Sequence, residues 1–379
     1  MDMRGYRQEF PLTESCVYLD HASQGPLPAQ SAESLRRAVG KGENPTLFGV
    51  EDVFELPREI RGLIANLIGA TPEEIGLTQS TGHGINIAAN CLDVKEGDTI
   101  LLFDKEFPSN VYPWLNLERR GARVEFIPGK SGHFDIDAFR KRIGARTKVL
   151  AISFVQFFNG FRIDLDAVTE ICRENGIYVF VDGSQGIGAL QFDVRTTPVD
   201  IMACCGAKWL LSPIGTGFVY VSERILPTMH PADVGWLSLP REESEEVFEH
   251  LTQYDFCLPD DARKFEVGSP LHIPLSAFKS SLELILTVGV DNIEKHITGL
   301  LDHLLVFLQS RDFPILSSLE PRHRSAILSF SAQDVRRVHT DLKKRGIYTS
   351  VREDGIRVSP HFYNTLEDMD RLIEVLDQV

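Results

Sequence analysis

Several features are missing from this sequence. It contains no apolar run of the length that crosses a membrane, and no apolar core near its N-terminus that would indicate a signal peptide. Basic residues are the minority, because 39 Lys and Arg stand against 54 Asp and Glu, which gives a net charge of −15. This charge argues against nucleic acid and against an anionic membrane as a partner. We therefore expect a chain that binds neither.

Cysteine is scarce and scattered. None of the six cysteines belongs to a CxxC pair, so we expect a reducing compartment, the cytoplasm, and no disulfide framework. The 11 histidines show no HExxH or other metal-ligand spacing. The sequence therefore predicts no metal site.

The chain has the length and composition of a globular enzyme with two domains. It has 379 residues, of which 43% are hydrophobic and 25% charged. Apolar strand patterns alternate with helical patterns, which favours an α/β fold with a mostly parallel sheet. We expect an N-terminal arm over 1–30 that joins the small domain, a large domain over 31–289 and a small α+β domain over 290–379. The expected strands are 75–78, 98–103, 123–127, 149–154, 177–181, 200–204, 217–221, 325–330, 347–351 and 356–358.

The stretch 177–221 carries the residues with the clearest chemistry. One expected strand ends at Asp182, with Gln185 three residues later, and the next strand leads into Lys208. Open α/β sheets bind their ligands at the carboxyl ends of such strands. Pyridoxal phosphate chemistry needs this pair, because a lysine forms a Schiff base with the aldehyde while an aspartate pairs with the protonated ring nitrogen. Taken singly, Asp182 also suits a helix cap and Lys208 a surface loop.

A second candidate site lies at the start of an expected helix. Ser80, Thr81 and Gly82 directly precede the apolar residues of this helix. Free backbone N–H groups and the positive end of the helix dipole attract a phosphate group at such a turn. An ordinary N-cap explains a single Ser or Thr equally well.

These motifs together resemble the class V aminotransferase and cysteine desulfurase family of fold-type I pyridoxal-phosphate enzymes. The resemblance rests on Asp-Gly-Ser-Gln-Gly, Cys-Gly-Ala-Lys-Trp and Gly-Thr-Gly, and runs from YLDHAS near the N-terminus to RVSPHFYNT near the C-terminus. It implies that the large domain binds the cofactor, and that Gln185 lies near the cofactor's phenolic oxygen. It also implies a homodimer in which Ser269, in a segment similar to RFE-x-GTP, contacts the partner's phosphate.

The resemblance implies further site residues. Phe107 falls where desulfurases stack a His on the cofactor ring, and a phenyl ring there cannot transfer a proton. Arg357 matches the arginine that binds the substrate's α-carboxylate, with a salt-bridged strand arginine as the alternative. Gln156 and His21 are candidate substrate contacts. Arg352 is a second candidate, for an acid group on the substrate's side chain.

The motifs indicate the reaction less specifically than they indicate the cofactor. Desulfurases of this type carry a nucleophilic cysteine shortly before the carboxylate-binding arginine, and this sequence has no cysteine from 331 to 379. Transamination at the α-carbon, with the freed Lys208 as general base, is the first expectation. The alternatives are β-elimination, including C–S lysis without a protein persulfide, and epimerisation of the isopenicillin N epimerase kind.

Two alternatives lie outside this chemistry. The glycines of GSQGIG resemble a nucleotide-binding loop, but the spacing and the mid-chain position do not fit an NAD-dependent dehydrogenase. An inactive scaffold protein of the same fold would be expected to lack Lys208, Asp182 or Arg357, and the sequence has all three.

Overall fold

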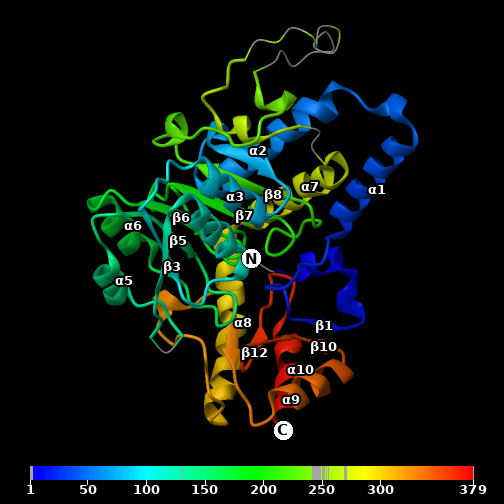
Figure 1. The fold of residues 1–379 in the computed structure, drawn as a ribbon. Helices are drawn as coiled ribbons and strands as arrows, with labels where there is room; N and C mark the ends of the chain where they lie inside the picture. The colour runs from blue at the N-terminus through cyan, green and yellow to red at the C-terminus, as the bar shows by residue number, and fades with distance from the viewer. Residues whose placement is uncertain are drawn as a thin grey trace.

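The computed structural model describes residues 3–130, 132–240, 249, 252, 254, 256–268 and 271–378. Within these residues, a seven-stranded sheet forms the centre of the molecule, and smaller sheets of three and two strands lie at its lower end (Figure 1). The strands are β1 Val17–Tyr18, β2 Ile75–Thr78, β3 Thr99–Phe103, β4 Arg123–Ile127, β5 Thr147–Ser153, β6 Tyr178–Asp182, β7 Ile201–Cys205, β8 Gly217–Val221, β9 Leu328–Phe330, β10 Ile347–Tyr348, β11 Ser350–Arg352 and β12 Gly355–Val358. The α-helices are α1 Ala29–Glu43, α2 Leu56–Ile68, α3 Thr81–Cys91, α4 Tyr112–Leu115, α5 Ile136–Arg142, α6 Leu165–Glu174, α7 His272–Val288, α8 Val290–Ser310, α9 Val335–Lys344 and α10 Leu366–Leu376.

The large sheet has the strand order β2-β8-β7-β6-β5-β3-β4. Five neighbouring strands, β4, β3, β5, β6 and β7, run parallel, and β8 is antiparallel to both of its neighbours. The expected mostly parallel α/β sheet is therefore confirmed, with β8 as the strand that makes it mixed. Since parallel strands end at the same edge, the loops after β3, β5, β6 and β7 meet there.

Both faces of this sheet are buried, because successive residues of a strand point to opposite sides. In β5, Leu150 and Ile152 join one apolar cluster, while Val149 and Ala151 join the other. Helices α2, α6 and α7 contribute to the first cluster, and α3 and α4 to the second. The result is a helix–sheet–helix sandwich, which explains why the strand sequences are almost continuously apolar.

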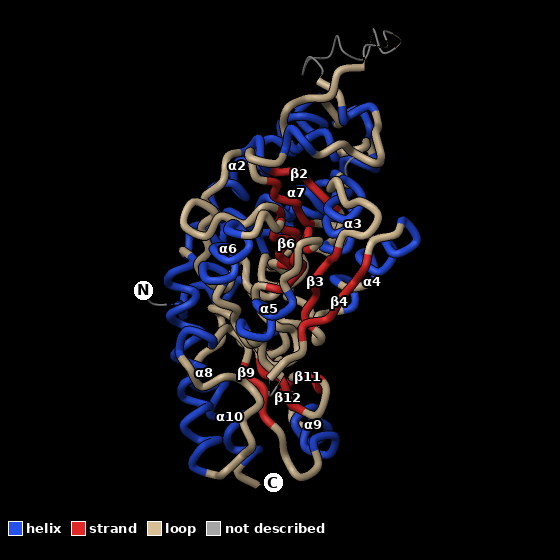
Figure 2. The backbone as a smooth tube through the Cα atoms, turned by 60° about the vertical axis from the view of Figure 1, so that its left-hand side comes forward, coloured by secondary structure: helices blue, strands red, loops and turns tan. Residues whose placement is uncertain are grey.

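The C-terminal part is a small sheet with helices, and the N-terminal arm joins it. Strands β11, β12 and β9 pair antiparallel, while β1 pairs in parallel with β10, Val17 opposite Ile347. Helices α9 and α10 lie beside these strands, and α8 runs down to them from the large sheet (Figures 1 and 2). The boundaries at residues 30 and 289 remain a prediction.

One expected strand is divided. The prediction of a single strand over 347–351 was wrong, because Ile347–Tyr348 pair with the arm whereas Ser350–Arg352 pair with β12. Thr349 separates the two pairings. The strand changes partner within three residues, and periodicity in sequence does not report which partner a strand takes.

Two further features concern helices. A π-helical turn, Glu51–Glu55, precedes α2, which carries Pro57 in its first turn. Among the described residues, no single helix is long and apolar enough to span a membrane. Helices α7 and α8 satisfy that criterion only when they are counted as one segment, and they meet at a bend of 75°.

Candidate active site

The predicted chemical residues lie where the parallel strands of the large sheet end. Asp182 is the last residue of β6, and Lys208 follows β7 by three residues. The loops after β3 and β5 carry Phe107 and Gln156. Four strands that are adjacent or nearly adjacent in the sheet thus bring these residues to one edge.

Asp182 is a buried carboxylate with 6% exposure. Its Oδ1 accepts a hydrogen bond from the backbone N–H of Ser184 at 2.9 Å. Burial raises the pKa of Asp182, while the Ser184 hydrogen bond and the positive charge of Lys208 lower it. Among the described residues, Asp182 makes no ion pair within 4 Å. A buried carboxylate of this kind fits a cationic ring nitrogen.

Lys208 lies against an aromatic ring. Its Nζ is 5.5 Å from the centroid of Phe107, which is 40% exposed. The Phe107 ring in turn makes an edge contact with Phe157, with centroids 5.2 Å apart. The N-terminal arm fixes the Lys208 loop from the other side, because a Cβ on Gly25 would lie 2.3 Å from the Lys208 carbonyl oxygen. The arrangement leaves an open phenyl face next to the lysine, as stacking on a cofactor ring requires.

The expected phosphate turn is the N-terminus of α3. Ser80 is the N-cap, and its Oγ accepts a hydrogen bond from the N–H of His83 at 3.1 Å. Thr81 Oγ1 and Ser184 Oγ lie 2.6 Å apart, which connects this turn to the turn after Asp182. Helix geometry leaves the N–H groups of Thr81 and Gly82 without intrahelical acceptors. The Ser80 hydroxyl caps the helix, so an anion bound at this turn would be held mainly by backbone N–H groups.

Gln185 bridges the arm and the lysine loop. Its Nε2 donates to the Ala22 carbonyl oxygen at 2.9 Å, and its Oε1 accepts from Trp209 Nε1 at 2.9 Å. The amide orientation is therefore fixed by two partners. One N–H of the amide remains for a ligand oxygen.

His21 is completely buried rather than exposed to solvent. Its Nε2 pairs with the hydroxyl of Tyr363 at 2.8 Å, and its ring lies 4.6 Å from that of His361 and 5.7 Å from that of Trp209. Burial lowers the pKa of His21, so the neutral imidazole is favoured. Nδ1 has no partner among the described residues. A direct contact of His21 with substrate stays a prediction.

Gln156 hydrogen-bonds to Glu106, a site residue that was not predicted from the sequence. Gln156 is fully buried and its Nε2 donates to Glu106 Oε1 at 2.8 Å, while its own Oε1 has no partner in the described part of the chain. Glu106 also accepts hydrogen bonds from the N–H and Oγ of Ser153 and from Asn110 Nδ2. Burial raises the pKa of Glu106, and these hydrogen bonds lower it. The sequence signal that could have found it is an acid in the loop after a buried strand, since Glu106 follows the end of β3 by three residues.

Arg357 is 1% exposed and is held by four acceptors. Its Nε donates to Ser350 Oγ, one terminal nitrogen donates to the Phe157 carbonyl oxygen at 2.7 Å, and the other donates to Asp20 and Ser23. Burial lowers the pKa of Arg357 to about 10, against the opposing effect of Asp20. Arg357 therefore makes a salt bridge, with Asp20, which is the alternative role given above for this strand arginine. One of its N–H groups remains for a substrate.

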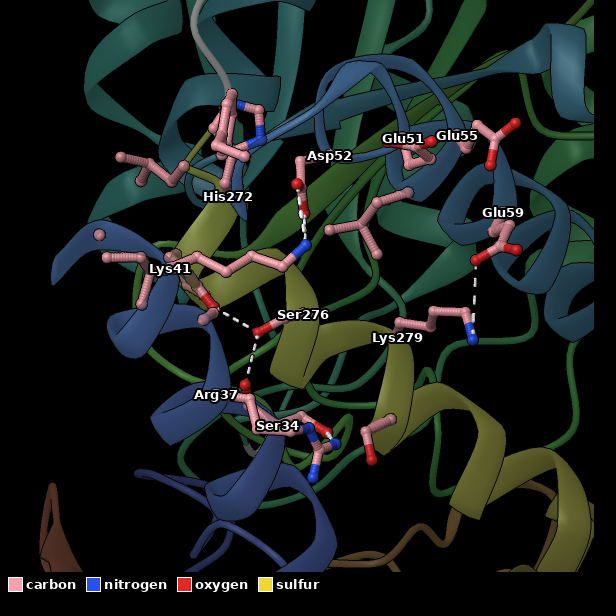
Figure 3. A pocket seen from close by; sticks show the side chains of 18 of the residues that line it. Ser34, Arg37, Lys41, Glu51, Asp52, Glu55, Glu59, His272, Ser276 and Lys279 are labelled. Carbon is pink, nitrogen blue, oxygen red and sulfur yellow. Dashed lines mark hydrogen bonds and ion pairs between the residues drawn. The ribbon is translucent and has the colours of Figure 1, made fainter. Parts of the chain in front are cut away.

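Ser269 lies outside the described residues, so its predicted contact with a partner subunit is not described. A pocket of about 950 Å³ lies nearby in the sequence, between α1, the turn Glu51–Glu55 and α7 (Figure 3). None of the predicted site residues lines it. Its charged side chains pair with one another, as Lys41 does with Asp52 and Lys279 with Glu59. The described residues contain no group of three or more His, Cys, Asp or Glu side chains arranged to hold a metal ion.

The donor set fits pyridoxal phosphate group by group. The N-terminus of α3 suits the phosphate, the Phe107 face suits the ring, and Asp182 suits the ring nitrogen. Gln185 has an N–H for the phenolic oxygen, and Lys208 supplies the amine for the aldehyde. Each residue of this set can take its role from the strand, helix or loop on which it lies.

Comparisons with known proteins agree with this geometry. The profile of the family described as Aminotransferase class-V matches residues 17–372. The chain is 25% identical to an uncharacterized aminotransferase, YcbU, of Bacillus subtilis over 97% of this chain and 96% of that protein. It is 27% identical to a probable cysteine desulfurase of Methanothermobacter thermautotrophicus over 98% and 97% of the two chains.

Among solved structures, a variant of the cystine C–S lyase C-DES, with glycine covalently linked to its pyridoxal phosphate, shares the fold. The TM-score is 0.89 and the identity 23%, and the match covers 98% of each chain. The profile covers nearly the whole chain, and the site offers one partner for each functional group of the cofactor. The chain therefore belongs to the class V aminotransferase family, whose members are fold-type I enzymes that use pyridoxal phosphate.

Proposed function

We propose that the chain acts on the α-carbon of an amino acid as an aminotransferase, with Lys208 as the residue that binds the cofactor and moves the α-proton. The observation that carries the proposal is the placement of Lys208 and the buried Asp182 at the carboxyl edge of the sheet, with Asp182 at the end of β6 and Lys208 three residues after the neighbouring strand β7. When bound, pyridoxal phosphate supplies an electron-poor ring that stabilises negative charge at the substrate's α-carbon. Asp182 would pair with the ring nitrogen and favour its protonated form, which maintains this capacity.

Lys208 would also serve as the base that moves the α-proton. Its Nζ lies 5.5 Å from the centroid of the Phe107 ring, and an amine that is not bonded to the cofactor can accept a proton. Phe107 has no titratable group, so Lys208 is the residue for proton transfer on this side of the ring. The half-buried position of Lys208 excludes part of the solvent from the proton transfer.

A second candidate is β-elimination, with release of sulfide or a persulfide product. It is supported by the absence of cysteine after position 331, because a C–S lyase needs no nucleophilic cysteine there. The buried Cys204 next to Lys208 does not replace it, since burial raises the pKa of its thiol well above the usual value. A persulfide-forming desulfurase is therefore the weakest of the family's activities for this chain.

We also propose a homodimer in which Ser269 of one subunit contacts the phosphate of the other, as the resemblance implies. The support is a group of exposed apolar side chains at the pocket of Figure 3. Leu271 and Ile273 follow Ser269 in the chain, and Leu47 and Phe48 lie before Glu51, with the Phe48 ring 4.8 Å from that of His272. Scattered apolar side chains are normal on a monomer, but a cluster next to a site suggests an interface. Light scattering after gel filtration should give twice the mass of the chain, and Phe48→Glu should reduce it.

The function is tested by absorbance. The wild-type protein is loaded with pyridoxal phosphate and recorded from 300 to 500 nm beside Lys208→Ala. We expect a band at roughly 410–430 nm, the usual range for a lysine-bound cofactor, that the variant lacks. L- and D-amino acids are then added while 2-oxo acid, the pyridoxamine form and sulfide are measured. Accumulation of the pyridoxamine form supports transamination, and release of pyruvate with sulfide supports elimination. A wild-type protein without the band would contradict the assignment of Lys208.

A further inference from the structure

Three phenylalanine rings form a row that begins at Lys208. The Nζ of Lys208 lies 5.5 Å from the centroid of Phe107, and the centroids of Phe107 and Phe157 are 5.2 Å apart. Phe158 continues the row, with its centroid 5.6 Å from that of Phe157 and the two ring planes at 69°. We call Phe107, Phe157 and Phe158 the phenyl row. It gives the carboxyl edge of the sheet an apolar surface next to the amine.

The loop after β5 holds its phenylalanines in two different environments. Four of the eight residues from 154 to 161 are phenylalanine. Phe154 and Phe161, at the two ends of this stretch, are core residues with 3% and 5% exposure. Phe157 and Phe158, in the middle, are only half-buried. Apolar area that the core of the protein leaves in water favours a ligand that covers it.

The backbone that carries the two half-buried rings is held from several sides. The carbonyl oxygen of Phe157 accepts a hydrogen bond from Arg357 at 2.7 Å. The side chain of Gln156 donates to Glu106 at 2.8 Å, and its carbonyl oxygen accepts from the N–H of Gly160 at 2.9 Å. Gly160 has a φ of +72°, which a glycine adopts without strain. A ligand that covers these rings therefore has little loop entropy to overcome.

The ring contacts limit the distance from Lys208 to the middle of the phenyl row. The Phe157 centroid can lie no farther from Nζ than 5.5 Å and 5.2 Å taken together. An aromatic amino acid has its ring centroid about 5 Å from its nitrogen, and ring contacts extend over about 4.5–7 Å. With the nitrogen at the place of Nζ, these two lengths cover the whole distance. The methyl group of alanine ends about 2.5 Å from the nitrogen and leaves most of it uncovered.

The phenyl row offers little to a polar side chain. A phenyl ring has no N–H, hydroxyl or carbonyl group with which to replace the water around a charged or amide group. A carboxylate placed on Phe157 and Phe158 would lose water without gaining a hydrogen bond from either ring, which is unfavourable. An apolar side chain gains from the same loss of water.

We propose that Phe157 and Phe158 bind the side chain of the substrate, and that the substrate is an amino acid with an aromatic or large aliphatic side chain. The proposal rests on the proposed function, in which the nitrogen of the substrate takes the place of Lys208 Nζ. Phe157 is the specificity-determining residue, because it is the ring of the loop after β5 that contacts Phe107. Phe107 itself is reserved for the cofactor ring.

The test compares L-phenylalanine with L-alanine and L-glutamate. Each is titrated into the cofactor-loaded protein, and the change in visible absorbance gives a half-saturating concentration. Wild type should need roughly 10- to 100-fold less L-phenylalanine than L-alanine, the ratio that follows from burying a side chain of this size. Phe157→Ser should weaken L-phenylalanine by most of this factor and leave L-alanine nearly unchanged. Phe157→Leu, which keeps an apolar surface, should recover part of the difference.

The control is Phe126→Ser, which removes a ring of 39% exposure from β4 and should keep the wild-type preference. Equal weakening of L-phenylalanine and L-alanine by Phe157→Ser would overturn the proposal, because a displaced Phe107 ring has that effect. A wild-type protein that prefers L-alanine would overturn it too. A preference for L-glutamate would do so in favour of the side-chain acid considered for Arg352.

The same variants distinguish a substrate from a partner subunit. If Phe157→Ser keeps the preference for L-phenylalanine but lowers the mass found by light scattering, the rings belong to a subunit interface and the proposal is wrong. If wild type responds to no amino acid, the proposed function fails, and this proposal fails with it.

Discussion

Among single residues, Glu106 links two segments of the site, the loop after β3 and the end of β5 with the loop that follows it. Its four hydrogen bonds reach Asn110 on its own loop, and Ser153 and Gln156 on the loop after β5. The rings of Phe107 and Phe157, one from each loop, meet directly beside these bonds. Glu106 is therefore a positioning residue, because it holds the two loops that carry the Phe107 and Phe157 rings and so would set where a cofactor ring stacks.

We expect Glu106→Gln to destabilise the protein by about 1–3 kcal/mol, the cost of leaving buried donors without acceptors. The glutamine amide would place its own N–H groups against those of Ser153 or Asn110. Urea unfolding gives the stability, and the position of the cofactor's visible band gives the stacking. Glu118→Gln, on an exposed residue, serves as the control. A variant with wild-type stability and an unshifted band would refute this role.

The residues of the site differ in how well the sequence predicts them. Lys208 and Asp182 were predictable, because polar residues stand out at the ends of apolar strands. Glu106 stands out less, because it lies three residues beyond the end of β3 and next to Phe107, which the resemblance made prominent. The salt bridge between Asp20 and Arg357 was not predictable as such, since 337 residues separate its partners and only the folded chain brings them together.

Among elements, the position of α3 on the sheet depends on a glycine. A Cβ on Gly84 would lie 2.6 Å from the Cβ of Ala203 in β7. The helix therefore lies closer to the sheet than any side chain allows. Since the N-terminus of α3 is the predicted phosphate turn, this contact also sets the distance from that turn to the edge of the sheet that carries Asp182 and Lys208.

Gly84→Ala should move α3 away from β7 and weaken cofactor binding. Alanine alone would favour the helix by roughly 0.5–1 kcal/mol, but overpacking should cost about 1–3 kcal/mol, so the net effect is destabilising. Gly62→Ala in α2 is the matched control, because its Cβ would meet no atom within 4 Å and should stabilise. Thermal unfolding and the rate of cofactor release measure both variants. Equal behaviour of the two would contradict the packing argument.

Most strands and helices were predictable at this scale. All seven strands of the large sheet were expected within about two residues, because both faces are buried and each strand is a short apolar run. The division of 347–351 was not, since it depends on the arm, which comes from the other end of the chain. The π-helical turn at Glu51–Glu55 was also missed, because its apolar spacing resembles that of an α-helix.

At the scale of the whole molecule, a cluster of rings joins three distant segments. His21 comes from the arm, Trp209 from the loop of Lys208, and His361 and Tyr363 from the C-terminal part. His361 donates its Nε2–H to the Trp209 carbonyl oxygen, and its Nδ1 accepts from Phe362 N–H. Burial lowers the pKa of His361 to about 3. The cluster therefore contains a neutral imidazole.

Stability should fall on acidification for this reason. Between pH 6.5 and 3 the unfolded chain binds a proton at His361 that the folded chain excludes, so the free energy of unfolding decreases as pH falls through this range. At pH 5 the loss from His361 is about 2 kcal/mol, and His21 acts in the same direction. Urea unfolding at pH 7.5 and pH 5.0 measures it.

The comparison is made between variants, because carboxylates titrate over the same range. His361→Asn should be less stable than wild type at pH 7.5, yet should lose less stability between the two pH values. His230→Asn, on an exposed histidine, should show the same loss as wild type. If His361→Asn loses as much as wild type, the buried imidazole does not account for the pH dependence.

The parallel pairing of β1 with β10 has a consequence for how the protein is made. Val17 and Ile347 are partners although 330 residues separate them. A ribosome that adds about 5–20 residues per second needs roughly 16–66 seconds to cover that distance. During that time the first strand has no partner strand, whereas the last strand of the large sheet, β8, ends at Val221 and is made well before β10. The arm that carries His21, Ser23 and Gly25 therefore closes the site last, after translation is almost finished.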